Sequence, residues 1–190
     1  MTRTEIINWF IKKYRYHSYL EIGAYRKENF DGVNCRYKKC VDPDSSCNAN
    51  YIMTSDKFFL ANKMKWGIVF VDGLHEKHQA LRDINNALKA IYNSGTILVH
   101  DCCPAHKRYQ LPEKKRAQWN GTTWKAFVHL RATRADLQMF TINEDNGIGV
   151  IRHGKQDLWP LAKIDWRKFN THKKSILNLV EFEEINKWLG

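Results

Sequence analysis

Two aspartates stand where two apolar runs end, and each has a histidine close by. Asp72 is followed by His75 three residues later, and Asp101 comes directly after His100. A helix-length amphipathic segment separates the two apolar runs, a pattern that predicts two parallel strands joined by a helix. In an open α/β sheet, ligands bind at the edge formed by the carboxyl ends of the strands. We therefore expect carboxylate and imidazole chemistry at that edge.

A second acidic pair closes two earlier strand-like runs. Glu21 is followed by Ile22 and Gly23, and Asp42 comes 21 positions after Glu21. Rossmann-like sites use an acidic residue at about this distance to accept hydrogen bonds from ribose hydroxyls. The first turn, residues 23–28, contains one glycine and lacks a Gly-x-Gly-x-x-Gly cradle, which argues against a pyrophosphate cofactor such as NAD.

S-adenosylmethionine suits this pattern better, because it carries a ribose, an adenine and a cationic sulfonium but no phosphate. Glu21 is expected near its amino group or sulfonium, Asp42 at the ribose, and Ser55 with Asp56 beside the adenine. The simpler alternatives are that Asp42 only caps a turn and that Asp56 only begins a helix. The predicted cofactor-binding residues are Glu21, Gly23, Ala24, Asp42, Ser55, Asp56 and Asp72.

The order of the predicted elements gives the fold class. Strands are expected at 18–23, 39–42, 51–54, 67–71, 96–99, 137–142 and 148–151; helices are expected around 6–11, near 58–59, and at 75–92, 122–131 and 165–190. The loop 143–147 contains Asn-Gly and predicts an antiparallel hairpin, and 93–95 contains the glycine expected to stop the preceding helix. The prediction is α/β: a Rossmann-like, doubly wound, mostly parallel sheet with an antiparallel C-terminal hairpin strand, in three α/β/α layers and one domain, 1–190.

Composition limits the class of protein. With 190 residues, 43% of them hydrophobic, the chain can bury a core, and no apolar run is long enough to span a bilayer. The first residues lack the apolar stretch of a secretory signal, so we expect a cytoplasmic protein whose five cysteines are reduced and serve as small apolar filler. The net charge of +11 is spread along the chain, which favours a solvated basic surface over a nucleic-acid-binding stripe.

Several segments together resemble class I S-adenosylmethionine-dependent methyltransferases, and most closely a small bacterial branch of the family 24 type. The segments are 19–23, 41–43, 53–59, 70–75, 82–84 and 99–102, with further likeness at 119–125, 147–151 and 177–189. The Asp-Gly-Leu-His sequence at 72–75 and the His-Asp pair at 100–101 are typical of that branch. Tyr25 and Lys27 depart from the general pattern, which often has glycine at these positions.

The resemblance implies that Asp72, His100 and Asp101 hold a divalent metal, as acidic groups at these strand ends commonly do in oxygen-methylating relatives. Mg²⁺ suits carboxylates, whereas a histidine shifts the preference towards Mn²⁺ or Zn²⁺. The ion would lower the pKa of an acceptor hydroxyl. The metal-free alternative uses His75 or His100 as the general base. The predicted catalytic set is Asp72, His75, His100 and Asp101.

The resulting functional hypothesis is methylation of a hydroxyl on a small-molecule or glycan acceptor. His106, Trp119 and Trp124 are candidates for the wall of the acceptor pocket, and homo-oligomerisation stays open. The alternative hypothesis is a basic nucleic-acid-binding module that has the fold but does not transfer methyl groups; it is motivated by the net charge and the missing glycines.

Overall fold

A central sheet organises the chain in the computed structural model, which describes residues 1–114, 118–160 and 164–189. Eight strands occur in the described residues, in the order β3-β2-β1-β4-β5-β7-β6-β8. Their bounds are β1 Ser18–Ile22, β2 Tyr37–Asp42, β3 Tyr51–Ile52, β4 Trp66–Val71, β5 Ile91–Val99, β6 Leu137–Ile142, β7 Ile148–His153 and β8 Leu179–Val180. β7 pairs antiparallel with β5 and β6, and the other neighbouring strands pair in parallel. The predicted fold class is confirmed.

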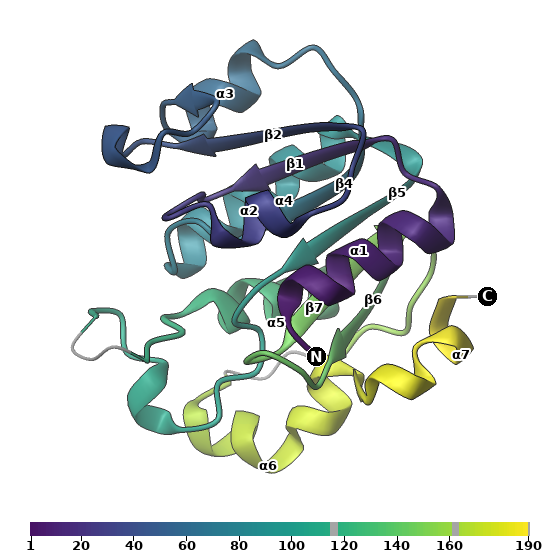
Figure 1. The fold of residues 1–190 in the computed structure, drawn as a ribbon. Helices are drawn as coiled ribbons and strands as arrows, with labels where there is room; N and C mark the ends of the chain where they lie inside the picture. Colours follow the sequence, from purple (N-terminus) through teal and green to yellow (C-terminus); the bar gives the residue numbers. More distant parts are fainter. Residues whose placement is uncertain (115–117, 161–163, 190) are drawn as a thin grey trace.

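Helices cover both faces of this sheet, as Figure 1 shows. The helices are α1 Arg3–Tyr14, α2 Glu28–Gly32, α3 Ser55–Ala61, α4 Lys77–Ala90, α5 Thr123–Thr133, α6 Trp166–Leu177 and α7 Asn186–Leu189. One apolar cluster joins α3, α4, α5 and α6 to the sheet, and a second joins α1, α2 and α7 to the opposite face. Residues of β4 alternate between the two clusters, Val69 in the first and Ile68 in the second, because successive side chains of a strand point to opposite faces.

Three local predictions need correction. The helix predicted to reach residue 92 ends at Ala90, and residues 93–95 lie within β5 beside an irregular register with β4. The predicted helical tail is interrupted by β8, whose register with β6 pairs Leu179 with Thr141. The short helix α2 was not predicted. Tertiary pairing with an existing strand overrides helical spacing in segments this short.

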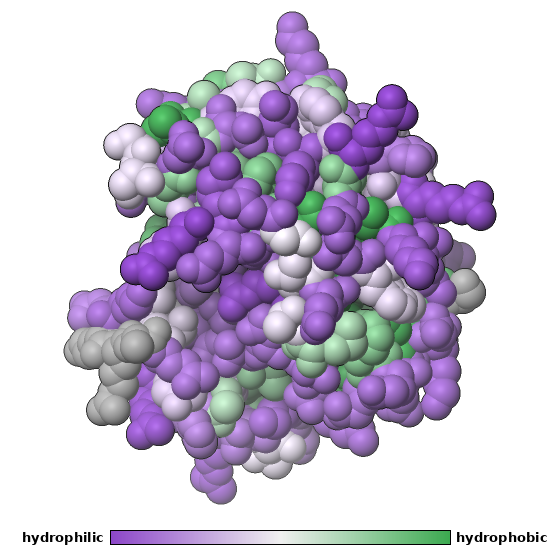
Figure 2. Space-filling view, viewed as in Figure 1, coloured by the Kyte–Doolittle hydropathy of each residue, from purple (hydrophilic) through white to green (hydrophobic). Residues whose placement is uncertain are grey.

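Strand direction decides which loops meet at one edge. Because β6 runs parallel to β5 through two antiparallel pairings, the hairpin loop 143–147 lies at the same edge as the carboxyl ends of β1, β2, β4 and β5. α1 also begins near this edge, beside the N-terminus in Figure 1. The face shown in Figure 2 is mostly hydrophilic and is hollowed on its left side, where the parallel strands end. Within the described part of the chain, every helix is too short or too polar to cross a membrane.

Candidate functional site

A cavity of about 980 Å³ lies at the carboxyl ends of the parallel strands. Eight of the chain's 20 acidic residues line it, although the chain as a whole is strongly basic. They are Glu21, Glu28, Asp42, Asp56, Asp72, Asp83, Asp101 and Asp145. All the predicted cofactor-binding residues and all four predicted catalytic residues also line this cavity. Arg3, Arg26 and Lys114 line it as well, so acidic residues outnumber lysine and arginine there by eight to three. This excess favours a ligand that carries positive charge.

Asp42 organises the turn that follows β1. Its Oδ2 accepts hydrogen bonds from the backbone amides of Ala24 at 2.9 Å and Tyr25 at 3.0 Å, and its Oδ1 accepts one from Asp44 N at 2.9 Å. A carboxylate offers about four lone-pair positions, so capacity for a ribose hydroxyl remains. Gly23 has a φ of +90°, and a Cβ there would lie 2.2 Å from the carbonyl oxygen of Asp72. Glycine is thus required for the turn to pack against the end of β4.

The same turn adopts glycine-like backbone conformations without further glycines. Tyr25 has a φ of 44° and Lys27 a φ of 62°, both in the left-handed region. These are the positions where the sequence departs from the general methyltransferase pattern. The backbone path is therefore retained, at the cost of strain that non-glycine residues carry in this region.

Glu21 is buried at the end of β1, with 2% of its surface exposed. Its Oε2 accepts hydrogen bonds from the Tyr19 hydroxyl and from Asn29 Nδ2, the latter at 2.9 Å. Burial raises the pKa of Glu21 to about 8, and the negative charge of Asp72 adds to the rise, while the hydrogen bonds from Tyr19 and Asn29 oppose it. A cationic ligand in the cavity would favour the ionised carboxylate.

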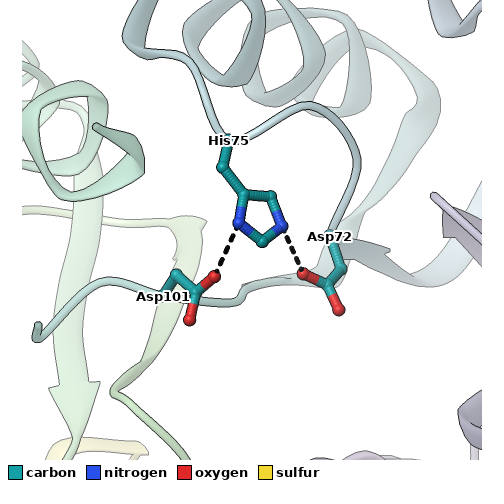
Figure 3. A group of neighbouring side chains, drawn as sticks. All are labelled: Asp72, His75 and Asp101. Atoms are coloured by element: carbon teal, nitrogen blue, oxygen red, sulfur yellow. Dashed lines mark ion pairs between the residues drawn. The ribbon is translucent and has the colours of Figure 1, made fainter. Parts of the chain in front are cut away.

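His75 lies between two carboxylates, as Figure 3 shows. Its Nε2 is 3.3 Å from Asp72 Oδ1 and its Nδ1 is 3.0 Å from Asp101 Oδ2. The second contact is an ion pair rather than a hydrogen bond, because Nδ1 lacks hydrogen-bond geometry to any described residue. Burial alone would lower the pKa of His75, but the carboxylates of Asp101 and Asp72 raise it to about 9. The imidazole is therefore protonated near neutral pH.

His100 is held by a different set of partners. Its Nδ1 lies 3.0 Å from Asp72 Oδ1, and its Nε2 lies 3.3 Å from Asp145 Oδ1. Burial disfavours the charged ring, yet Asp72, Asp101 and Asp145 together raise the pKa of His100 well above its ordinary value. Nδ1 also lies 3.4 Å from Asp101 Oδ1, so His100 contacts both carboxylates of the His75 pair. The group of His, Cys, Asp and Glu ligand atoms that lie close enough together to share an ion, among the described residues, nevertheless contains His75 and not His100. The structure thus brings His75, rather than His100, into a potential ligand group with Asp72 and Asp101.

Arg3 completes the charge balance from the start of α1. Its guanidinium lies 2.7 Å from Asp72 Oδ2 and 2.9 Å from Asp145 Oδ2. Burial opposes the charge on Asp72, but His100 and His75 favour it, and the pKa of Asp72 lies well below its usual range. The sequence predicted neither Arg3 nor Asp145 as a site residue. No local signal marks them, because only the direction of α1 and of the hairpin brings them to this edge.

The segment after β5 folds back over His75. The Trp119 ring stacks on the imidazole with centroids 4.9 Å apart, and Asn120 Nδ2 donates to Asp101 Oδ1. Asn120 Oδ1 is buried and has no hydrogen-bond partner among the described residues. Gly121 has a φ of +60°, and a Cβ there would lie 2.1 Å from the carbonyl oxygen of His75. Residues 119–121 therefore fix the segment after β5 to His75 and Asp101 at the edge of the cavity.

The three predicted residues of the acceptor-pocket wall separate in the structure. Trp119 lines the cavity. Trp124 is buried in the core, with its ring 4.1 Å from that of Phe169, so it belongs to the packing of α5 on α6. His106 is exposed and is not among the lining residues. Tryptophan at helical spacing fits the core equally well, and its type alone could not separate the two roles.

One protein family matches part of the chain. Residues 39–102, from β2 to just beyond β5, match a family described as a methyltransferase domain. This segment contains Asp42, Ser55, Asp56, Asp72, His75, His100 and Asp101. No curated protein sequence matches the chain.

Solved structures share the fold at low sequence identity. The O-methyltransferase TomG from Streptomyces achromogenes, in complex with SAM, has a TM-score of 0.58 at 12% identity, over 80% of this chain and 79% of that one. The SAH-bound methyltransferase PaMTH1 from Podospora anserina has a TM-score of 0.57 at 14% identity, over 82% and 80%. An O-methyltransferase from Bacillus cereus in complex with SAH has a TM-score of 0.56 at 10% identity, over 80% of each chain. The predicted resemblance is confirmed: residues 39–102 match the methyltransferase domain family, and the chain has the fold of class I methyltransferases.

Proposed function

We propose that the protein transfers a methyl group from S-adenosylmethionine to a hydroxyl oxygen of a small-molecule or glycan acceptor. The observation that carries this proposal is the convergence of Glu21, Asp42 and Asp72 on one acid-lined cavity in a methyltransferase fold. S-adenosylmethionine carries a sulfonium and an ammonium, which such a cavity would attract in a chain of net charge +11. Cytoplasmic location, homo-oligomerisation and the single-domain organisation stay predictions.

The cofactor roles follow the order of the strand ends. Glu21 is 2% exposed and would receive the amino-acid end of the cofactor, where its carboxylate can balance the ammonium or sulfonium. Asp42 fixes the turn 23–28 and keeps lone-pair capacity for a ribose hydroxyl. Ser55 and Asp56, at the start of α3, would lie beside the adenine. Each role uses a residue that lines the same cavity.

The reacting centre would lie beside Asp72, His75 and Asp101. Methyl transfer forms a bond between the acceptor oxygen and the methyl carbon as the carbon–sulfur bond breaks, so alignment of the three atoms supplies much of the rate. The Asp72 and Asp101 carboxylates have lowered pKa values, so they would accept a hydrogen bond from the acceptor hydroxyl and orient it rather than hold its proton, which would pass to water. The protonated imidazole of His75 would stabilise negative charge on the oxygen. The raised pKa of both histidines makes them weaker candidates for the initial base than the sequence suggested.

A divalent ion fits the same group of side chains. Asp72, His75 and Asp101 each offer one ligand atom, and these atoms lie within 4.8 Å of one another. His75 therefore replaces His100 in the proposed ligand set. A ligand nitrogen must be unprotonated, so an ion bound there would displace the proton that His75 otherwise carries near neutral pH and would take over the role of its positive charge. An ion bound there would supply a Lewis acid that lowers the pKa of the acceptor hydroxyl.

Calorimetric titration with S-adenosylhomocysteine tests the cofactor proposal. We expect micromolar to submicromolar binding that Asp42→Ala weakens about tenfold or more, since it removes both the ribose acceptor and the anchor of the turn. Arg134→Ala, a change of a half-buried residue at the opposite edge of the sheet, should leave the affinity unchanged. The absence of heat and of a thermal shift at millimolar ligand would contradict the proposal.

The metal proposal needs its own readout. Adding Mn²⁺ to protein treated with a chelator should raise the melting temperature of the wild type, because an ion bound only to the folded state stabilises it. Asp101→Asn should abolish that shift while the protein remains folded by circular dichroism. A wild type that shows no shift at millimolar Mn²⁺, Mg²⁺ and Zn²⁺ would favour the metal-free version of the reaction.

A further inference from the structure

Asp83 is an ionisable side chain on the packed face of α4. It is 1% exposed, and Ala80, Ile84 and Ala87 on the same face are buried in the core. A buried carboxyl needs hydrogen-bond partners to offset the loss of water. Asp83 also lines the cavity. It is neither one of the residues proposed to bind the cationic groups of the cofactor nor one of those proposed for the reacting centre. Its position therefore calls for another explanation.

The partners of Asp83 are both cavity-lining residues. Gln79 Nε2 donates to Asp83 Oδ1 at 3.0 Å and lies 3.1 Å from Ser55 Oγ. Burial raises the pKa of Asp83, and the hydrogen bonds with Ser55 and Gln79 oppose that rise. Asp83 thus connects α4 to the start of α3 through one amide and one hydroxyl.

Arg82 fixes the orientation of that amide. Its guanidinium donates to Gln79 Oε1, and its Nε lies 3.6 Å from Asp56 Oδ2. With the carbonyl oxygen of Gln79 held by Arg82, the amide nitrogen faces Ser55 and Asp83. We call these five residues, Ser55, Asp56, Gln79, Arg82 and Asp83, the α3–α4 bridge. Four of them, all except Arg82, line the cavity.

The polar atoms of this bridge are mostly acceptors. Asp56 and Asp83 contribute carboxylate oxygens, and the amide nitrogen of Gln79 is already donating within the bridge. A ligand group placed against it must therefore donate hydrogen bonds. The exocyclic amine of adenine does so, whereas the carbonyl oxygen of hypoxanthine would face carboxylates without a donor.

We propose that Gln79 and Asp83 are positioning residues that hold Ser55 and Asp56 so that the cavity selects a 6-aminopurine over a 6-oxopurine. The proposal rests on the proposed function, because it takes the nucleoside end of S-adenosylmethionine as the ligand. It assigns a specificity role to α4 in addition to its packing on the sheet, α3 and α5.

Calorimetric titration with S-adenosylhomocysteine and with S-inosylhomocysteine tests this assignment. The two ligands differ only at the purine 6-position and the adjoining ring nitrogen. We expect the wild type to prefer the adenine compound by about tenfold or more, and Gln79→Met and Asp83→Asn each to lose most of that preference. Asp136→Asn is the matched control: Asp136 is exposed beside the amino end of β6, at the opposite edge of the sheet. It should keep the wild-type ratio.

The ratio of the two affinities separates this role from a structural one, because general loosening of α4 would weaken both ligands alike. Asp83→Asn alters a buried group and could prevent folding. In that case Gln79→Met provides the test, because Gln79 is only half-buried. Equal ratios in wild type and variants, or a wild type that binds both compounds equally, would overturn the inference and leave cofactor binding intact. A wild type that binds neither compound would overturn the proposed function as well.

Discussion

The same chemical group behaves differently at neighbouring strand ends. Glu21, enclosed by apolar strands and near the negative Asp72, has a raised pKa, whereas Asp72, surrounded by Arg3, His75 and His100, has a lowered one. Burial acts on both carboxyls in the same direction, so the neighbouring charges decide the difference. At the scale of single residues, the cavity therefore holds one carboxyl that titrates near neutral pH beside others that stay ionised.

Binding of S-adenosylhomocysteine should depend on pH through Glu21. The cationic amino group favours the ionised carboxylate, so the affinity should rise as the pH increases from 6.5 to 8.5, through the pKa of about 8. We expect a change of about threefold to tenfold in the wild type and a flat profile in Glu21→Gln. Calorimetric dissociation constants across this range check the prediction. A wild-type profile as flat as that of the variant would contradict it.

The stability of the unliganded protein should show the opposite trend. The pKa of Glu21 is about 8 in the folded state against 4.5 for the ordinary group, so folding favours the protonated form. This contribution is fully present below pH 4.5 and is lost as the pH rises through 8. Glu21→Gln keeps an acceptor for Tyr19 and Asn29 without the charge. The free energy of unfolding of the variant minus that of the wild type should increase by on the order of a few kcal/mol between pH 5 and pH 9. Urea denaturation at both pH values measures the increase.

Lys27 tests the strain in the turn after β1. Its φ of 62° costs a non-glycine residue about 1 kcal/mol or more. Lys27→Gly should therefore stabilise the protein by up to about 1 kcal/mol, less the small loss of its surface contacts. Lys27→Ala removes the same side chain but keeps a Cβ, so it should show no gain. Equal unfolding free energies for the two variants would indicate that the backbone is not strained.

At the scale of elements, α1 is tied to the site by its first turn. Thr2 caps the helix in a capping box with Glu5, and Arg3 then reaches both Asp72 at the end of β4 and Asp145 in the hairpin loop. Three elements that are distant in sequence thus meet through one guanidinium. The planar group suits this task, because it can bind two carboxylates in fixed geometry.

Arg3→Met should destabilise the protein by about 1–3 kcal/mol, because it removes one of the two cations that contact both partly buried carboxylates and leaves only His100 between them. Arg3→Lys should recover only part of the loss, since an ammonium cannot reproduce the two-sided contact. Lys12→Met, an exposed change on the same helix, should be within about 0.5 kcal/mol of the wild type. Denaturant unfolding curves measure all three. An Arg3→Met variant as stable as the Lys12→Met control would show that the contact contributes nothing.

At the scale of the whole molecule, charge is unevenly divided. Eight of 20 acidic residues line one cavity, so the rest of the surface carries an excess of lysine and arginine above the net charge of +11. A basic surface around an acidic cavity would draw in acceptors that carry negative groups while keeping the cofactor cation bound. It also motivates the alternative hypothesis of nucleic-acid binding.

Gel retardation with an oligonucleotide separates the two hypotheses. If the basic residues are only scattered over the surface, we expect retardation of the oligonucleotide at low salt and none at roughly physiological ionic strength. The reason is that the affinity would then come from counterion release alone. Saturating S-adenosylhomocysteine should leave it unchanged. Binding that persists at high salt and is displaced by the cofactor product would instead indicate a nucleic-acid partner at the cavity.

The sequence by itself determined the strand ends and the chemistry on them. Apolar runs, a glycine turn and acidic residues at fixed spacing are local properties, and they correctly predicted the fold class. The predicted strand-end residues line one cavity, whereas His106 and Trp124, predicted for its wall, do not; the roles of these residues stay predictions. It also predicted the hairpin, because Asn-Gly is a local turn signal.

Only the tertiary structure decided which groups touch. The sequence offered His75 and His100 as alternative bases and named only His100 as a metal ligand. In the structure His75 lies between Asp72 and Asp101, while Asp145 of the hairpin loop lies against His100. Arg3 lacked any local signal for the site, and Asp83, although it lies in the segment 82–84 that resembles the family, was not predicted to line the cavity. Helix direction and helix–helix contact bring both residues there. Side-chain pairing across elements depends on how the elements pack, and that information is spread over the whole chain rather than over any one segment.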